Sequence, residues 1–405
     1  MREMKGSGVE WLGEIPAGWD VDRFGSLFAC RNEKVSDVDY EPLSVTKSGV
    51  LPQLSHVAKS DDHANRKLVR GGDFAINSRS DRRNSCGFSS QDGSVSLINT
   101  VCIPRKKFDS RYYAHLFDTS QWADEFYSWG HGIVADLWTT GWNDMKRIAL
   151  PVPPIDEQRR IADYLDERCA EVDRAISAAE QSIQEYVVYK KSLVTETVRR
   201  VGGKRLRLRH LCSRVFDGPF GSHLKSADYI DEGIRVVRLE NLRYMSFDDS
   251  KRSFVSQEKY ETIARHTVIP TDLIMATFVA KEVQVASLPE GVQFAVNKAD
   301  CVGLRLKSEI CVNRYVQYAL SSNVVFDYLR SNLHGTTRDR VNTSQIKEIP
   351  LLIPSLDEQR RIAGYLDDRC SQVDSAIAAK QAIISDLKAY KQSLVYEVVT
   401  GKREV

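Results

Sequence analysis

The chain contains no long hydrophobic run: no segment approaches the roughly 18 consecutive apolar residues at which a membrane-spanning helix becomes a candidate. The first eight residues also lack the apolar core of a secretory signal. We therefore expect the protein to reside in the cytoplasm. Otherwise the composition is that of a soluble globular protein, with 42% apolar and 28% charged residues, and a length of 405 residues predicts about two or three domains.

Motifs for metal and redox chemistry are missing too. The eight cysteines include no C-x-x-C pair, which argues against zinc ribbons and thioredoxin-type sites, and the eight histidines form no H-x-x-x-H pair. We therefore expect no bound metal. Cys169 and Cys370, which occupy equivalent positions of the repeat described below, are interpreted as small buried hydrophobic residues.

Signatures of catalysis are equally scarce. The sequence has no phosphate-binding loop of the G-x-x-x-x-G-K-[ST] type, no G-x-G-x-x-G, no G-x-S-x-G and no N-P-P-aromatic motif of amino-methyltransferases. A strong charge bias is absent as well, because the net charge is only +2. Any nucleic-acid-binding hypothesis must therefore rest on local clusters of basic residues.

The most informative feature that is present is a duplication. Residues 156–165 return as residues 357–366, at an offset of 201, and the match continues without a gap to Val198 and Val399. Of the 45 pairs between residues 156–200 and 357–401, 25 are identical. A repeat this clear predicts two similar halves.

Both copies of the repeat have the pattern of a long helix with one apolar seam. Apolar residues recur at alternating steps of four and three, as a coiled coil requires. Lys190 and Lys391 interrupt the two seams at equivalent positions, and such an interruption fixes register. The residues that we assign to the contact between helices or with a partner are Leu165, Val172, Ile176, Ile183, Leu193, Leu366, Val373, Ile377, Ile384, Leu387 and Leu394.

The helix ends are marked in the sequence. Pro153 and Pro154 precede the first copy, Ser355 and Glu358 have the spacing of a capping box before the second, and glycines follow both. Each helix should span about 45 residues, or roughly 67 Å. We expect the two to pair antiparallel, because a globular segment of about 150 residues joins them. The alternative is that each helix packs on its own domain.

The segments before the helices, residues 1–150 and 204–352, contain short β-rich runs and are weakly alike. Residues 69–76 align with 268–275, and residues 111–132 align with 314–335. The globular parts have therefore diverged more than the helices. A retained scaffold with two altered binding domains would give this pattern.

Basic and polar residues gather in one stretch of the first globular segment. Arginine and asparagine suit bidentate contacts to guanine and adenine, and lysine suits phosphate. A solvated loop is the alternative interpretation. The candidates for DNA contact in this segment are Lys47, Arg66, Lys67, Asn77, Arg79, Arg82 and Arg83.

The second globular segment has a glycine-rich loop at residues 217–225, which would either hold a phosphate or be a structural turn. Residues 335–340 combine glycine, hydroxyl groups and arginines, and residues 199–214 carry seven basic residues and no acid, as a solvated linker or a phosphate-facing stripe would. The candidates for DNA contact in this segment are Gly218, Phe220, Gly221, Ser222, Lys225, Arg238, Asn241, Lys281, Thr336, Thr337, Arg338 and Arg340.

With these features, the chain resembles the specificity subunits of type I restriction–modification systems. Residues 7–19 are similar to the N-terminus common in that family, and the doubled entry to the helix at residues 156–165 and 357–366 is similar to its conserved helical regions. Residues 217–225 and 335–338 resemble recurrent stretches of its target recognition domains. The likeness covers essentially the whole chain.

The resemblance implies an α+β protein in which two similar mixed α/β domains are separated by a long antiparallel two-helix coiled coil, with a pseudo-twofold internal repeat. Residues 1–150 and 204–352 would be target recognition domains, and residues 151–203 and 353–405 the helical regions. The chain would read a bipartite, asymmetric site on double-stranded DNA and have no catalytic site. Two modification subunits would bring S-adenosylmethionine and methylate adenine, and restriction subunits would bring ATP, magnesium and cleavage.

Two alternatives from other classes remain. One is a nuclease or methyltransferase fused to a coiled coil, which would itself bind S-adenosylmethionine or cut DNA. The other is a coiled-coil scaffold with no role on DNA, whose complete complex would show no sequence preference.

Overall fold

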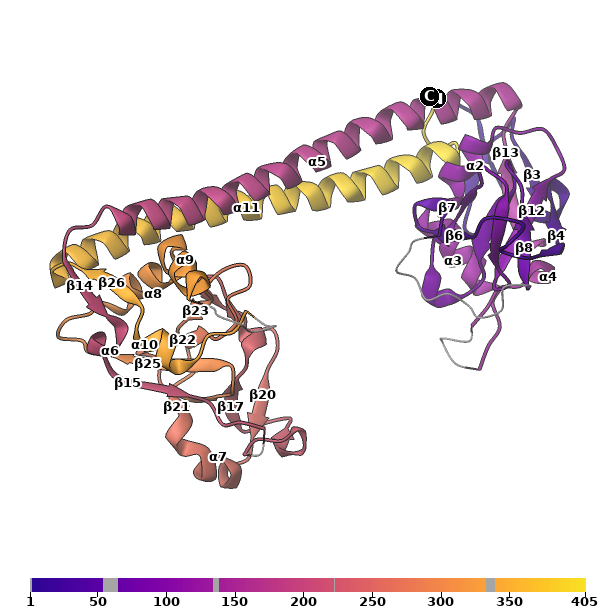
Figure 1. Cartoon of the computed structure of the whole chain (residues 1–405). Coiled ribbons are helices and arrows are strands. Elements are labelled where there is room, and N and C mark those ends of the chain that lie inside the picture. The colour runs from indigo at the N-terminus through magenta and orange to yellow at the C-terminus, as the bar shows by residue number, and fades with distance from the viewer. Residues whose placement is uncertain (1, 54–64, 134–137, 222, 333–338) are drawn as a thin grey trace. The chain divides into compact units, whose positions relative to one another are not determined.

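The computed structural model describes residues 2–53, 65–133, 138–221, 223–332 and 339–405 (Figure 1). The chain divides into two compact units. Unit 1 consists of Met1–Glu180 and Gln381–Val405, and unit 2 consists of Gln181–Lys380. Both boundaries between the units fall within long helices, so each unit contains one globular part and portions of both helices.

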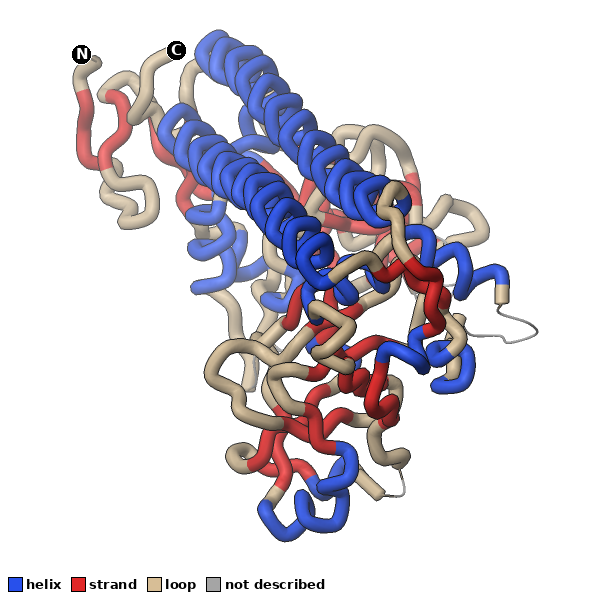
Figure 2. The backbone as a smooth tube through the Cα atoms, turned by 90° about the vertical axis from the view of Figure 1, so that its left-hand side faces the viewer, coloured by secondary structure: helices blue, strands red, loops and turns tan. Residues whose placement is uncertain are grey.

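The two helices predicted from the repeat are confirmed. Helix α5 spans Ile155–Arg199 and helix α11 spans Leu356–Val399 (Figure 2). The hydroxyl of Ser355 accepts a hydrogen bond from the backbone N–H of Glu358 at 3.3 Å, as the capping pattern predicts. Gly401 ends α11 in the left-handed region, with φ +71°, which a residue without Cβ adopts at little cost.

The globular part of unit 1 is built on small antiparallel sheets. A four-stranded sheet has the order β10-β9-β12-β4, and a three-stranded sheet has the order β11-β8-β5. The strands of these sheets are β4 (Phe28–Arg31), β5 (Lys34–Val35), β8 (Arg66–Val69), β9 (Phe74–Asn77), β10 (Cys86–Phe88), β11 (Gly93–Ser96) and β12 (Asn99–Pro104). Three strand pairs complete the unit: β1 (Met4–Gly6) with β2 (Glu14–Pro16), β3 (Asp20–Arg23) with β13 (Ala149–Val152), and β6 (Leu43–Thr46) with β7 (Gly49–Pro52).

Aromatic rings form the core of unit 1, between the four-stranded sheet and short helices. Phe24, Phe28, Phe74, Phe117 and Trp122 are all buried and in contact with one another. Buried aromatic rings remove a large apolar area from water, so this cluster contributes strongly to the stability of the unit. The helices of the unit are α1 (Phe24–Leu27), η1 (Ser80–Arg82), α2 (Ser110–Phe117), α3 (Ser120–Ser128) and α4 (Trp142–Met145).

The same core includes parts of both long helices. Leu165 near the start of α5 and Leu394 and Val398 near the end of α11 belong to one buried cluster. The lysine Nζ of Lys391 lies 2.7 Å from the carboxylate of Asp173. Within unit 1, therefore, the first part of α5 packs against the last part of α11.

Unit 2 has a four-stranded antiparallel sheet and a five-stranded mixed sheet. The first has the order β15-β25-β22-β23, and the second has the order β16-β20-β17-β24-β21, in which β17 and β24 are parallel. The strands are β15 (Cys212–Asp217), β16 (Tyr229–Ile230), β17 (Ile234–Val237), β20 (Ser253–Val255), β21 (Thr267–Val268), β22 (Asp272–Ala276), β23 (Val285–Ala286), β24 (Ala295–Asn297) and β25 (Cys301–Leu306). Two strand pairs are added, β14 (Lys204–Arg207) with β26 (Pro350–Ile353) and β18 (Leu242–Arg243) with β19 (Ser246–Phe247).

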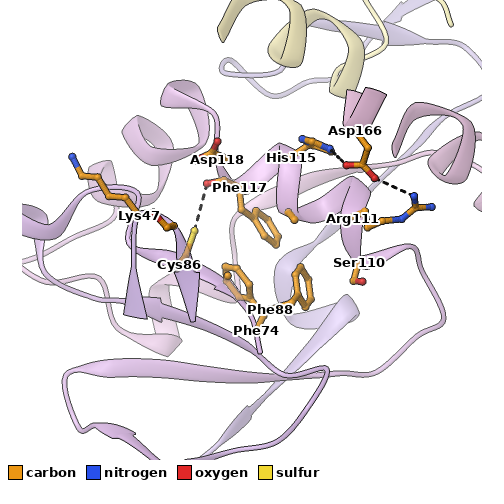
Figure 3. Close-up of a pocket in the computed structure, with 14 residues that line it drawn as sticks. Lys47, Phe74, Cys86, Phe88, Ser110, Arg111, His115, Phe117, Asp118 and Asp166 are labelled. Carbon is orange, nitrogen blue, oxygen red and sulfur yellow. Dashed lines mark hydrogen bonds and ion pairs between the residues drawn. The ribbon is translucent and has the colours of Figure 1, made fainter. Parts of the chain in front are cut away.

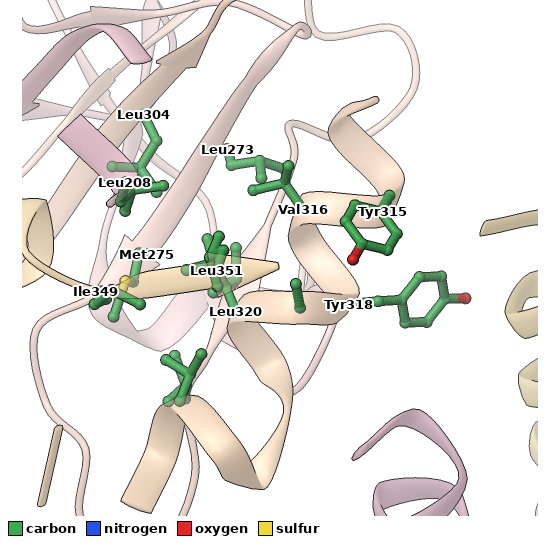
Figure 4. Packing of buried hydrophobic residues seen from close by; sticks show 14 of the residues in the cluster. Leu208, Leu273, Met275, Leu304, Tyr315, Val316, Tyr318, Leu320, Ile349 and Leu351 are labelled. Carbon is green, nitrogen blue, oxygen red and sulfur yellow. The ribbon is translucent and has the colours of Figure 1, made fainter. Parts of the chain in front are cut away.

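The main core of unit 2 lies between the four-stranded sheet and the consecutive helices α8 and α9. Leu273 and Leu304 of the sheet pack with Val316 and Leu320 of α8 and with Leu351 of β26 (Figure 4). The same cluster contains Leu366 of α11 and Val194 of α5, so here the first part of α11 packs against the last part of α5. The helices of the unit are α6 (Leu208–Leu211), η3 (Ser226–Asp228), η4 (Leu239–Asn241), α7 (Gln257–Ile263), η5 (Ala264–His266), α8 (Asn313–Ser321), α9 (Asn323–Ser331) and α10 (Thr343–Lys347).

The weak likeness between the globular segments has a structural counterpart. Asp73 and Asp272 each accept a hydrogen bond from the backbone N–H three residues earlier and form an ion pair with an arginine. Gln158 and Gln359 each receive a backbone N–H from the turn before a short helix of their own unit, at 2.9 and 2.8 Å. The two units thus repeat the same joint between globular part and long helix.

Two details differ from the sequence analysis. The basic run at residues 199–214 is not a linker throughout, because residues 204–207 form β14 and pair with β26. The seam of the helices is buried at Leu165, Val172 and Leu366 but only half-buried at Ile183 and Ile384. In the described part of the chain no helix is long and apolar enough to cross a membrane.

Candidate nucleic-acid interface

Unit 1 presents a compact group of arginines on the short helix η1 and its flanks. The side chains of Arg82 and Arg83 are 68% and 50% exposed. Arg82 lies 3.7 Å from Asp81, while Arg83 pairs with Asp124 and lies over the ring of Tyr127 at 5.6 Å. Ion pairs this exposed contribute little to stability, so the guanidinium groups can exchange them for phosphate or base contacts.

The loop that carries these arginines is held by the residues around it. Asn77 accepts a hydrogen bond from the backbone N–H of Arg79 at 3.0 Å, and Asn84, with φ +59°, donates to the carbonyl of Asp118 at 3.1 Å. The hydroxyl of Tyr127 donates to the carbonyl of Arg82 at 3.3 Å. Asn77 thus positions Arg79 through its backbone.

Two other basic candidates of unit 1 are engaged inside the fold. Arg66 is 6% exposed, and its Nε and Nη2 donate to the hydroxyl and the carbonyl of Ser94 at 2.8 and 2.9 Å. Lys67 is half-buried and donates to the carbonyl of Asn99 at 2.6 Å. Burial lowers the pKa of both cations. The local sequence could not distinguish Arg66 and Lys67 from the exposed Arg82. Both residues lie on a strand, β8, and their burial depends on the neighbours that pack against its two faces.

Lys47 is exposed in the turn between β6 and β7, at the rim of a pocket of about 460 Å³ (Figure 3). The floor of this pocket is aromatic, with Phe74 and Phe117. On its other side Arg111 and His115 of α2 contact the carboxylate of Asp166 of α5, at 3.1 and 2.8 Å. The pKa of Arg111 is raised, mainly through Asp109 and Asp163. Because Arg111 and His115 are already paired with Asp166, this side of the pocket is a joint between α2 and α5.

In unit 2 the glycine-rich loop lies beside the end of β24. A Cβ at Gly218 would overlap the backbone of Lys298, so Gly218 serves close packing of two backbones. Gly221 has open space around it, Phe220 is 55% exposed and Lys225 is exposed. The loop therefore combines a structural turn with an exposed aromatic ring.

Next to this loop is a hollow of about 520 Å³ whose wall carries several cations. Arg238 and Lys298 both lie over the ring of Tyr229, at 5.6 and 5.2 Å. Arg243 is exposed and pairs with Asp248 at 2.7 Å. The lining residues are Arg238, Leu239, Glu240, Arg243, Gln284, Lys298, Ala299 and Asp300.

Of the candidates in unit 2, Arg238 is the one that the structure brings into this hollow. Asn241 is 1% exposed and accepts a hydrogen bond from the backbone N–H of Arg238 at 2.9 Å, so it positions the arginine. Arg340 is exposed and pairs with Asp300 at 2.5 Å, at the edge of the hollow. Lys281 is exposed. Ser222, Thr336, Thr337 and Arg338 lie outside the described residues.

Sequence reasoning missed Arg243, Gln284, Lys298 and Tyr229. The first three lie at separate places in the sequence among other polar residues, and none belongs to a dense basic cluster. They meet because β18, β23 and β24, which belong to three different sheets, come together at the hollow. The one available signal was Lys298 itself, a basic residue that directly follows the buried strand β24.

The arrangement suits the binding of a nucleic acid more than catalysis. Exposed guanidinium groups over aromatic rings can hold phosphates, hydrogen-bond to base edges and support stacking. Among the described residues, no group of three or more histidine, cysteine, aspartate or glutamate side chains could hold a metal ion.

Comparison with known proteins shows what the chain is similar to. A family model described as "Type I restriction modification DNA specificity domain" matches residues 254–389. The type I restriction enzyme MjaVIII specificity subunit of Methanocaldococcus jannaschii is 20% identical over 64% of this chain and 63% of its own length. The StySPI specificity subunit of Salmonella potsdam is 27% identical over 42% of this chain and 37% of its own length. The matches thus span less than two thirds of these relatives.

Solved structures share the fold over nearly the whole chain. A chain from a structure described as "Structural basis underlying complex assembly and conformational transition of the type I R-M system" has a TM-score of 0.73, 16% identity and coverage of 96% of this chain and 99% of that one. The HsdS subunit from Thermoanaerobacter tengcongensis has a TM-score of 0.50, 18% identity and coverage of 96% and 98%. Together with the doubled helix entry, these findings show that the chain is similar to type I restriction–modification specificity subunits, that residues 254–389 match their DNA specificity domain, and that the chain has the fold of the HsdS subunit.

Proposed function

We propose that this chain is the sequence-specific subunit of a type I restriction–modification complex and that it reads a bipartite, asymmetric site on double-stranded DNA. The observation that carries the proposal is that each unit has its own exposed basic surface beside an aromatic ring, on a scaffold shared with known specificity subunits. The chain itself would supply recognition and no catalysis.

The asymmetry of the site follows from the difference between the two surfaces. In unit 1 the cations are three arginines on and around a short helix, next to Tyr127. In unit 2 they are Arg238, Arg243 and Lys298 around a hollow. Because different side chains in different places would face the bases, the two half-sites should have different sequences.

The spacing between half-sites would be set by the two long helices. Their antiparallel pairing is supported separately in each unit, by Asp173 with Lys391 and by Asp374 with Lys190. A two-stranded helical rod of fixed length resists bending more than a loop does. Half-sites roughly one helical turn apart, about 34 Å, would then present their major grooves on the same side of the duplex.

The long helices also offer surfaces to partners. Val188 and Tyr189 of α5 are 66% and 54% exposed, and Ile383 and Tyr390 of α11 are 48% and 47% exposed. Tyr189 and Tyr390 are equivalent in the repeat, so two identical subunits could use them in the same way. In this proposal two modification subunits dock here and bring S-adenosylmethionine, restriction subunits bring ATP and magnesium, and the complex works in the cytoplasm.

Sequencing of DNA methylation in a host that expresses this chain with its cognate modification subunit tests the proposal. The expected result is adenine methylation within one motif of two unlike half-sites and a fixed unread spacer. Methylation without sequence preference would support a scaffold with no role on DNA. Binding of S-adenosylmethionine by the isolated chain would instead favour an enzyme.

A further inference from the structure

Unit 1 contains a feature with no counterpart among the described residues of unit 2: a segment that covers the place where the two long helices meet the globular part. Residues 2–19 pack there in an extended path with tight turns, and Leu12, Ile15 and Trp19 are fully buried. They share one cluster with Leu394 and Val398 of α11.

Polar contacts fix this segment on both helices. The guanidinium of Arg2 lies 2.5 Å from the carboxylate of Glu157 of α5 and 5.1 Å from the ring of Trp19. The hydroxyl of Tyr396 of α11 donates to the carbonyl of Trp11 at 2.8 Å. Pro16 and Trp19 also lie so close to Gly401 that a Cβ there would overlap them.

In unit 2 the repeat equivalents of these positions line an open groove of about 330 Å³. Thr197, Glu358, Ile362 and Tyr365 stand at the positions of Val398, Glu157, Ile161 and Tyr164 in unit 1. Residues 201–203 lead directly from α5 into β14, so the described part of the chain supplies no segment of its own to this place.

The exposure of equivalent side chains shows the difference. The side chain of Glu157 is 14% exposed under Arg2, whereas that of Glu358 is 38% exposed. Val398 is fully buried, whereas its equivalent Thr197 is half-buried. Tyr164 is half-buried, whereas its equivalent Tyr365 is 44% exposed. Glu358 pairs with a cation of its own helix, Arg361, at 2.6 Å, and an exposed pair of this kind is readily exchanged.

We infer that the groove in unit 2 receives an extended segment of a partner polypeptide with the chemistry of residues 2–19: an arginine for Glu358 and a tryptophan with neighbouring apolar residues for the face of Thr197 and Tyr365. The charges agree, because the groove carries two arginines and one glutamate while residues 2–19 carry two basic and three acidic side chains. The identity of the partner rests on the proposed function, in which it is the modification subunit.

A labelled synthetic peptide of residues 1–20 is the probe, and the full-length chain is the target. Fluorescence polarisation should show saturable binding. Glu358→Lys and Tyr365→Ala should each weaken it by about tenfold or more, whereas Asp368→Lys, an equal charge change on an exposed position of the same helix, should leave it within about twofold. A peptide with Arg2→Glu should fail on the natural chain and recover on Glu358→Arg.

The site of binding needs its own measurement, because the peptide could exchange with the segment already in unit 1. A photo-reactive group in place of Trp11 of the peptide should cross-link to residues 197–202 or 358–365. Cross-links to residues 157–164 or 394–402, an absence of saturable binding, or equal weakening by Asp368→Lys would overturn the inference. Self-association of the chain that Glu358→Lys abolishes would overturn it too, by assigning the groove to a second copy.

Failure of this inference is separable from failure of the proposed function. A chain that directs methylation to a bipartite motif but does not bind the peptide contradicts only the inference about the groove. A chain that binds the peptide but directs methylation to no motif contradicts only the role on DNA.

Discussion

Lys190 on α5 donates to both carboxylate oxygens of Asp374 on α11, at 2.7 Å each. The repeat equivalents of these two residues, Lys391 and Asp173, form the same pair in the other unit, also at 2.7 Å. Each lysine that interrupts an apolar seam therefore pairs with a carboxylate of the opposite helix. An apolar seam tolerates several registers, but a pair of opposite charges that must meet tolerates few.

Exchange of these charges tests the register. Lys190→Asp should place two carboxylates together and lower the unfolding temperature of unit 2, by an amount that corresponds to about 1 kcal/mol, because the pair is partly exposed. Adding Asp374→Lys should recover most of that stability. Thermal unfolding of the single and double variants is the measurement, and a double variant no better than the single would contradict the pairing.

The arginines of η1 should act on one half-site only. Arg82→Ala or Arg83→Ala is expected to change or relax the methylated motif at one half, because a bidentate contact to a base supplies about 1–3 kcal/mol of discrimination against the wrong base. Lys107→Ala, an exposed position of the same unit, is the control. Methylome sequencing reads both halves at once, and an equal effect on both would mean that these side chains contact phosphates or affect assembly.

Arg66 offers a contrast with Arg82. Because its guanidinium is buried against Ser94, Arg66→Ala should lower the stability of unit 1 by about 1–3 kcal/mol while leaving the methylated motif unchanged. Denaturant unfolding, together with methylome sequencing at a permissive temperature, checks this. An altered methylated motif with unaltered stability would mean that Arg66 contacts DNA after all.

Two glycines of one loop should respond differently to alanine. Gly218→Ala is expected to destabilise unit 2 by at least about 2 kcal/mol, since the new Cβ would overlap the backbone of Lys298 and shift the wall of the hollow. Gly221→Ala, where nothing lies within 4 Å of the added atom, should be close to neutral. Thermal unfolding of both variants is the test. Equal stability would show that the loop moves freely away from β24.

Lengthening both helices tests whether they set the spacer. Insertion of one heptad after Ile183 and another after Ile384 keeps the seam in phase and adds roughly 10 Å, or about three base pairs of duplex. The tolerated spacer should lengthen accordingly in a methylation assay on sites with graded spacers. If the natural spacer remains the preferred one, the helices do not measure the distance.

The local sequence of the candidate interface was only a partial guide. Arg79, Arg82 and Arg83 were found because they lie together in one loop, and this loop stays together on the surface. Arg66 and Lys67 came from the same cluster but sit on β8, where packing against Ser94 and Asn99 draws them inward. Lys298 and Tyr229 escaped notice, because residues far apart in sequence meet only when the five-stranded sheet has formed.

The sequence by itself determined the two long helices, their ends and their apolar seams, because helical periodicity, capping residues and glycine stops act within a few residues of one another. It also determined the duplication, since identity at a constant offset needs no fold to be seen. Only the tertiary structure decided which basic side chains are exposed, that Lys190 meets Asp374, and that residues 2–19 cover one helix junction while the equivalent groove stays open. These properties depend on contacts between distant segments, and no local pattern encodes which distant neighbour a residue will have.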